Sequence, residues 1–389
     1  METLINLFRN NIRQYGMIIA LVLITGLFWI LTEGIIFNPL NLTNLILQNG
    51  FILVLAVGMV LVIITGNIDL SVGSVVAFVG AISGVLMINN NVPVVLAIIL
   101  SLLVGALIGV WQGFWIAYIG IPSFIVTLAG MLIFRGLTLY LLDGQSLAPF
   151  PDSFGILSGG FLPDLFGSDG LHILTIILSG ILSLVLIYME FKNRKSQVQY
   201  NFEVIPLWIT VTKLALLIYV INWFAYQLAL NKGIPMVLVI VFVLIIIYTF
   251  IMNNTVMGRH IYATGGNKKA ADLSGIKTKR VVFWVFVNNG VIAALAGLMF
   301  ASRLDSATPA AGNMLELDAI AAVFIGGASM AGGVGTVIGA IVGGLVMGIM
   351  NNGMSLIGIG IDWQQAIKGM VLLLAVGFDV YNKNKAGNS

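Results

Sequence analysis

Two breaks in an otherwise apolar sequence hold most of the side chains that could do chemistry in this chain. The first break, Gly66–Ser74, reads GNIDLSVGS, and the second comes just before another apolar run. The candidates are Asp69, Ser71, Ser74, Glu316 and Asp318. Their carboxylates and hydroxyls can hydrogen-bond a polar solute, or Asp69 or Ser71 can cap the following helix by accepting bonds from its free N–H groups. For Asp69 both roles stay open.

The sequence lacks the residue combinations that usually form a catalytic site. The chain has no Cys and only two His, His172 and His260, which are too few and too far apart in sequence to suggest a metal site. No GxxxxGK[ST] segment and no Gly-Lys pair occur, so the phosphate-binding loop of an ATPase is absent. We expect no enzyme activity, no metal and no cofactor, and any ATP must be bound by a separate subunit.

The elements that position these residues are membrane spans. Hydrophobic residues make up 59% of the 389, charged residues make up 8%, and the mean hydropathy is +1.07. Several apolar runs exceed the ~18 residues that a helix needs to cross the hydrocarbon, and none alternates as a barrel strand would. The sequence therefore predicts an all-α, polytopic transmembrane helical bundle of about 10–12 spans. We place them near 17–37, 51–65, 74–88, 94–118, 123–142, 171–189, 207–229, 234–252, 281–300, 318–331, 335–351 and 364–380.

Arg135, in the segment IFRG, is the only basic residue between Arg13 and Lys192. A charge inside a span is costly and marks a candidate site by default, so Arg135 joins the candidates for a polar path. Its expected position near the outer end of a span favours a simpler role, in which the long side chain reaches the interface.

The positive charges set the orientation in the membrane. Basic residues cluster before the first span, in two loops near 192–195 and 259–280, and in the tail. Cytoplasmic loops carry such an excess, so both termini are expected in the cytoplasm and the acidic segment Asp143–Asp169 outside. No long Lys/Arg run with interleaved aromatic residues appears, so we expect no nucleic-acid partner.

A short internal repeat divides the chain. Gly66-Asn67, Phe78-Val79-Gly80 and Ser83 recur with one offset as Gly312-Asn313, Phe324-Ile325-Gly326 and Ser329. The two copies start on opposite sides of the membrane, which is the arrangement of the inverted repeats found in transporters. The expected division is a cytoplasmic N-terminus 1–16, a first transmembrane repeat with its outer loop 17–164, an inserted helix pair 165–232, a second repeat 233–380 that includes a cytoplasmic loop 253–280, and a cytoplasmic tail 381–389.

The most hydrophilic stretch between two apolar runs is Gly258–Gly275, which reads GRHIYATGGNKKAADLSG. We expect it to serve a partner outside the membrane. The alternative is a basic surface that touches lipid headgroups, which Lys268 and Lys269 would suit. The Gly-Gly pair and the small residues have no use in headgroup binding, so the partner role is favoured.

Five blocks in order resemble the membrane permeases of monosaccharide ABC importers of the ribose, xylose and galactose class. The blocks are Gly66–Ser74, Pro122–Gly136, Gly258–Gly275, Ser302–Gly312 and Glu316–Gly333, and the resemblance covers nearly the whole chain. The extra length near Leu165–Lys232 looks most like the xylose and multiple-monosaccharide branch. Ala328 and Met330 stand where the family usually carries Thr and Leu, which leaves the specific sugar open.

The resemblance implies a permease that forms the path for a monosaccharide in a prokaryotic plasma membrane and catalyses no reaction. It implies a second permease copy, a cytoplasmic ATP-binding subunit and an extracytoplasmic sugar-binding protein. It also implies that the polar stretch is the coupling loop for the ATPase. The motif positions are Gly258, Arg259, Tyr262, Gly265, Gly266, Asn267, Ala271, Leu273 and Gly275.

Two alternative functions remain. An ion-coupled secondary transporter would also show inverted repeats and broken helices, with Asp69 as the carrier carboxylate, although it would not need the polar loop. ABC permeases for nucleosides or branched-chain amino acids share weaker versions of the same blocks.

Overall fold

The computed structural model describes residues 12–167, 170–200, 202, 204 and 206–387. Its long helices are α2 (Ile12–Leu31), α3 (Pro39–Ile64), α4 (Val72–Gly84), α5 (Val94–Phe114), α6 (Ser123–Leu141), α8 (Ile173–Gln199), α9 (Leu207–Ala229), α10 (Met236–Asn254), α13 (Thr278–Leu304), α15 (Val337–Leu356) and α16 (Ile361–Gly387). Shorter ones are α7 (Asp152–Gly159), α11 (Val256–Gly266), α12 (Lys268–Leu273) and α14 (Leu315–Ile325). Over this described part of the chain, two isolated bridges are the only β-pairing, which confirms the predicted all-α bundle.

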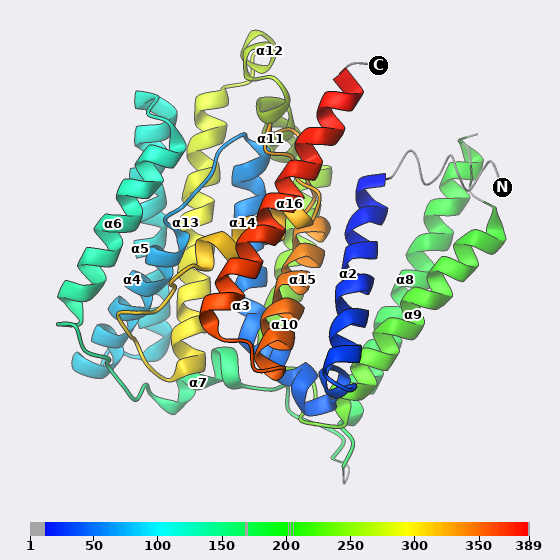
Figure 1. Ribbon diagram of the computed structural model, residues 1–389, viewed down its shortest axis with the longest axis horizontal. Helices are drawn as coiled ribbons and strands as arrows, with labels where there is room; N and C mark the ends of the chain where they lie inside the picture. The colour runs from blue at the N-terminus through cyan, green and yellow to red at the C-terminus, as the bar shows by residue number, and fades with distance from the viewer. Residues whose placement is uncertain (1–11, 168–169, 201, 203, 205, 388–389) are drawn as a thin grey trace.

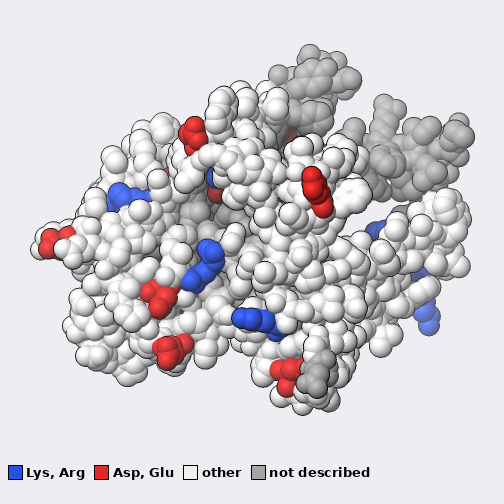
Figure 2. All heavy atoms as spheres, turned by 60° about the horizontal axis from the view of Figure 1, so that its bottom comes forward, with Lys and Arg blue, Asp and Glu red and all other residues white. Residues whose placement is uncertain are grey.

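The described residues contain nine helices that are long and apolar enough to cross a membrane, and α2 contributes a shorter apolar helix, Gly16–Leu31. Figure 2 shows a face on which charged side chains stand singly among uncharged atoms, as a protein surrounded by lipid requires. The predicted span at 318–331 is wrong as a full crossing. Helix α14 has 11 residues, and at 1.5 Å per residue it covers only about half of the ~30 Å hydrocarbon core.

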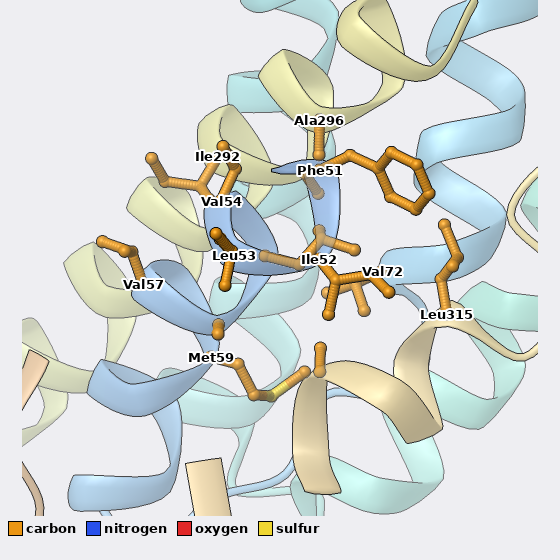
Figure 3. Close-up of a cluster of buried hydrophobic side chains, with 14 of the residues drawn as sticks. Phe51, Ile52, Leu53, Val54, Val57, Met59, Val72, Ile292, Ala296 and Leu315 are labelled. Carbon is orange, nitrogen blue, oxygen red and sulfur yellow. The ribbon is translucent and has the colours of Figure 1, made fainter. Parts of the chain in front are cut away.

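Helices α3 and α13 form the centre of the bundle. The most hydrophobic stretch of α3 is 89% buried and that of α13 is 72% buried, whereas that of α9 is 6% buried. Figure 3 shows Val54 and Val57 of α3 packed with Ile292 and Ala296 of α13. Since buried, mainly apolar residues surround the central stretches of both helices, the remaining helices can pack on nearly every side of them.

The contacts of the two halves correspond to one another. Helix α13 packs against α4 and α5, and α3 packs against α14 and α15. In the same way α6 lies against α4, and α16 lies against α14. This correspondence supports the division into repeats 17–164 and 233–380, which stays a prediction.

The segment between these halves forms a helix pair at the edge of the molecule. Helices α8 and α9 pack on each other, and α9 contacts α3 (Figure 1). The start of α2, the end of α16 and α12 lie at one end of the molecule, with α7 at the other. The predicted N-terminal segment 1–16 and tail 381–389 lie outside the described residues at 1–11 and 388–389.

Backbone contact between α5 and α13 depends on glycine. A Cβ at Gly109 would lie 2.5 Å from the Phe286 carbonyl oxygen and 2.6 Å from the Val287 Cα, where backbone cannot move aside easily. Across the same interface a Cβ at Gly290 would lie 2.2 Å from the Gly105 carbonyl oxygen. Small residues at such contacts are what allow close packing of helices in membranes.

We expect Gly109→Ala to lower the stability of the purified protein by about 1–3 kcal/mol, because the added methyl group forces α5 away from α13. Thermal unfolding in detergent measures the effect. The matched control is Gly136→Ala on α6, where a Cβ meets nothing within 4 Å and the change only improves helix propensity. Equal melting temperatures for the two variants would show that the α5–α13 contact is not tight.

Candidate polar site between two interrupted helices

The beginnings of α4 and α14 meet inside the bundle. Helix α3 ends at Ile64, and an irregular segment leads to α4, as the alternating pattern of Gly66–Ser74 predicts. At the meeting point a Cβ on Gly73 would lie 2.2 Å from the Glu316 Oε2 and 2.3 Å from the Gly312 carbonyl oxygen. Only glycine at Gly73 allows this approach, and it joins the two sequence breaks in one place.

Asp69 is held by three hydrogen bonds at this junction and is 2% exposed. Its Oδ1 accepts from the Ser71 N–H at 2.8 Å and from the Ser71 hydroxyl at 2.6 Å. Its Oδ2 accepts from the Asn289 Nδ2 of α13 at 2.8 Å. The predicted capping role is wrong, because no side chain at the start of α4 accepts a bond from the helix N–H groups. Asp69 instead ties the irregular segment to α13.

Two amide side chains complete this network, and sequence reasoning missed both. Asn289 binds Asp69, and Gln112 of α5 donates from Nε2 to the Ser71 hydroxyl at 2.6 Å. Each is buried within an otherwise apolar helix. A carboxamide in such a span is the signal that could have identified them, since polar groups inside a membrane need an internal partner.

Glu316 is 9% exposed, and its Oε2 has no hydrogen-bond partner among the described residues. It lies within electrostatic reach of Arg135, Asp318 and Asp69. The Ser74 hydroxyl is also buried without a partner. A buried carboxylate oxygen without a donor costs free energy, so this place can accept a hydrogen bond from a hydroxyl-bearing solute.

Arg135 holds the loop that leads into α14. Its Nη1 donates to the Pro309 carbonyl oxygen at 3.1 Å and to the Ala311 carbonyl oxygen at 2.6 Å. The guanidinium of Arg135 therefore binds protein carbonyl groups, and its position at the membrane interface stays a prediction. The loop has irregular backbone whose carbonyl groups need donors inside the protein, and the guanidinium supplies them.

Asp318 lies on a different side of α14, against α16. The Lys368 Nζ is 2.9 Å from its Oδ1 and 3.2 Å from its Oδ2. The structure thus brings Asp69, Ser71, Glu316 and Arg135 to one junction and places Asp318 in a separate ion pair. Lys368, a cation inside the last apolar run, was missed, although its place in that run is itself the signal. No group of three potential metal-binding side chains forms among the described residues.

The polar stretch near 258–275 forms the two short helices α11 and α12. Thr255 caps α11 by accepting from the Gly258 N–H at 3.3 Å, and Asn267 caps α12 by accepting from the Ala270 N–H at 3.0 Å. Ala271 is buried, whereas Leu273 is 91% exposed. A large apolar side chain exposed on a polar loop is available for contact with another protein.

The end of α11 touches the backbone next to the first helix break and the backbone of the loop that follows α14. A Cβ at Gly265 would lie 1.6 Å from the Ile64 carbonyl oxygen and 2.6 Å from the Gly333 nitrogen. The Gly333 N–H donates to that same Ile64 oxygen at 2.8 Å. We call Ile64, Gly265 and Gly333 the glycine junction. It joins α11 to the end of α3 and to the loop that follows α14.

Two neighbours of the glycine junction differ in their surroundings. The Tyr262 hydroxyl donates to the Gly335 carbonyl oxygen at 2.8 Å. Burial raises the pKa of the Tyr262 phenol above its ordinary value, so the hydroxyl keeps the proton that it donates. A Cβ at Gly266, in contrast, meets nothing within 4 Å. Gly265 faces the bundle, and Gly266 has open space beside it.

Comparisons with known proteins agree over most of the chain. It is 40% identical over 375 residues to the xylose transport system permease protein of Haemophilus influenzae, which covers 96% of this chain and 98% of that protein. It is 37% identical over 376 residues to the xylose transport system permease protein of Escherichia coli, covering 97% and 94%. The ribose import permease protein of Bacillus subtilis is 34% identical over 372 residues, covering 96% and 94%.

These relatives confirm the resemblance that the sequence blocks indicate. No solved structure matches the chain. A family model described as branched-chain amino acid transport system / permease component matches residues 41–376. The chain belongs to that permease family.

Proposed function

We propose that this chain is the permease of an ATP-driven importer and forms the path for a monosaccharide. The observation that carries the proposal is one polar junction, built from two interrupted helices, whose flanking backbone touches a polar loop outside the spans. The names of the relatives supply the solute class, since they are xylose and ribose permeases. The ATPase, an extracytoplasmic sugar-binding protein and a second permease copy are further parts of this proposal.

The path at the junction suits a solute that carries several hydroxyl groups. Among the described residues Glu316 Oε2 and the Ser74 hydroxyl lack partners, so when the junction opens a sugar hydroxyl can donate to the first and bond the second. Asp69, Ser71 and Arg135 keep the surrounding backbone in place through their own bonds. Such a site binds weakly, because high affinity would hinder release.

The loop α11–α12 is proposed as the contact with the ATPase. Arg259 and Leu273 are exposed, and Ala271 and Gly258 are buried against the bundle. Movement of α11 would reach the first helix break through Ile64, and α14 through the loop that follows it, by way of the glycine junction. This assignment places the loop and both termini in the cytoplasm of a prokaryotic cell, with 17–164 and 233–380 as the two repeats and 165–232 as the inserted pair.

The geometry disfavours an ion-coupled transporter. Asp69, its candidate carrier carboxylate, already accepts three hydrogen bonds, and freeing it would disrupt the links to Ser71 and Asn289. A branched-chain amino acid permease is the second candidate, because the family description names that solute class. An amino acid is a zwitterion and a sugar is uncharged. Comparing the uptake of the two solutes distinguishes the two candidate functions.

Reconstitution tests the proposal. Proteoliposomes that contain the chain, its ATPase and its binding protein are given labelled xylose, ribose and leucine. We expect sugar uptake that requires all components and ATP. Leucine uptake would replace the solute class, and uptake by the chain alone under an ion gradient would overturn the ATP-driven mechanism.

We expect Glu316→Gln to lower sugar uptake about tenfold or more, because the amide removes a charged acceptor whose hydrogen bonds contribute about 1.5–3 kcal/mol. Initial rates in the same vesicles measure it. Glu33→Gln, at an exposed acid, is the matched control. Equal rates for Glu316→Gln and the wild type would remove Glu316 from the path.

We expect Gly265→Ala to reduce the sugar moved per ATP hydrolysed, because the methyl group separates α11 from Ile64 and Gly333. Paired measurement of uptake and phosphate release gives the ratio. Gly266→Ala, with no neighbour within 4 Å, should keep the wild-type ratio in the same assay. If both variants keep it, the glycine junction does not transmit movement.

A further inference from the structure

A hollow lies between α14, α15 and α16, apart from the α4–α14 junction. It is partly open to its surroundings, and the room inside it for water-sized contents is about 50 Å³. Its walls include Met314, Leu317, Asp318, Gln365, Lys368 and Leu372. The hollow is smaller than pockets that enclose a whole ligand, so a solute would rest at its opening, and its lining is mostly apolar with a few polar groups.

The polar wall is the ion pair of Asp318 and Lys368. The side chains are 7% and 19% exposed, and both Asp318 oxygens face the Lys368 Nζ. An ammonium group has three N–H donors, and within the part of the chain that the structure describes the Lys368 Nζ bonds this one carboxylate. Charged groups inside spans face a partner or a water-filled cavity and mark solute pathways, so this wall is unlike a lipid-facing surface.

Helix α14 connects the hollow to the path. Glu316 contacts the start of α4, and Asp318, two residues later, contacts α16. Successive helical residues differ by about 100°, so the two acids stand on well-separated sides of the helix. A solute leaving one acid can reach the other around a single short helix.

We propose that this hollow is a second monosaccharide contact site, in which Lys368 and Gln365 donate to sugar oxygens and Asp318 accepts from a hydroxyl. Leu317 and Leu372 offer apolar surface to the C–H face of the ring. The inference rests on the proposed function, since it takes a sugar as the solute. A lipid chain would occupy the apolar part of the hollow and make no hydrogen bond with Asp318 or Lys368.

The absence of Cys from the sequence allows a direct test. Leu317→Cys places one thiol on the wall of the hollow, at a residue 39% exposed, and Ser146→Cys places one on an exposed loop as the control. Both variants, in the full chain in proteoliposomes, are treated with a small water-soluble thiol reagent, with and without D-xylose or D-ribose. The wild type is assayed for sugar import in parallel.

We expect the reagent to modify Leu317→Cys, and sugar to slow this reaction about threefold when its concentration is about twice the Kd. Ser146→Cys should react at the same rate with or without sugar. Adding Asp318→Asn or Lys368→Gln to Leu317→Cys should abolish the protection and leave the modification. Lys368→Arg, which keeps the charge, should retain protection and shows that the site tolerates a substitution.

Three results would overturn the inference. Leu317→Cys could resist the reagent, which would mean that water does not reach the hollow. Sugar could fail to protect it while the wild type imports sugar. Protection could persist in both the Asp318→Asn and the Lys368→Gln variants, which would make the ion pair only a link between α14 and α16. Wild-type vesicles that import no sugar would instead contradict the proposed function, independently of the labelling result.

Discussion

Backbone groups and charges at membrane depth must find partners inside the protein, and the rest of this structure depends on how two broken helices meet that demand. The breaks satisfy each other: Gly73 lies against Gly312, Asp69 holds one irregular segment and Arg135 holds the other. Almost every polar group at the junction is paired. Among the described residues, Glu316 Oε2 and the Ser74 hydroxyl are the exceptions, and these unpartnered oxygens give a polar solute something to bind.

The need of backbone groups for partners inside the protein also links the junction to the loop α11–α12. The Ile64 carbonyl oxygen, freed where α3 ends, accepts from Gly333 and is approached by Gly265 of α11. Three segments far apart in sequence therefore share one backbone contact. A contact between backbones cannot be absorbed by a change of side-chain rotamer, so displacement of α11 must displace its neighbours. In our proposal, this contact is the physical basis for coupling an outside partner to the path.

The sequence predicts the structural features that depend on a local residue pattern. It fails for the features that depend on contacts with residues far away in the chain. The alternation around Asp69 indicates an irregular segment, and the apolar runs indicate the bundle. The caps, the half-length of α14 and the bonds of Arg135 depend on loops that no local pattern describes. Gly265 becomes informative only when its neighbours Ile64 and Gly333 in other segments are known. Likewise, two adjacent glycines look equivalent in sequence, although only Gly265 is enclosed.

The central claim is that ATP-driven movement of the polar loop separates the two helix breaks. The chain has no Cys, so Asn67→Cys combined with Asn313→Cys carries one spin label beside each break. The most direct measurement is the distance between these labels in the complex with the ATPase, without nucleotide and with ATP trapped. Our account predicts two distributions that differ by several ångströms. One unchanged distribution, in a preparation that imports sugar, would contradict it.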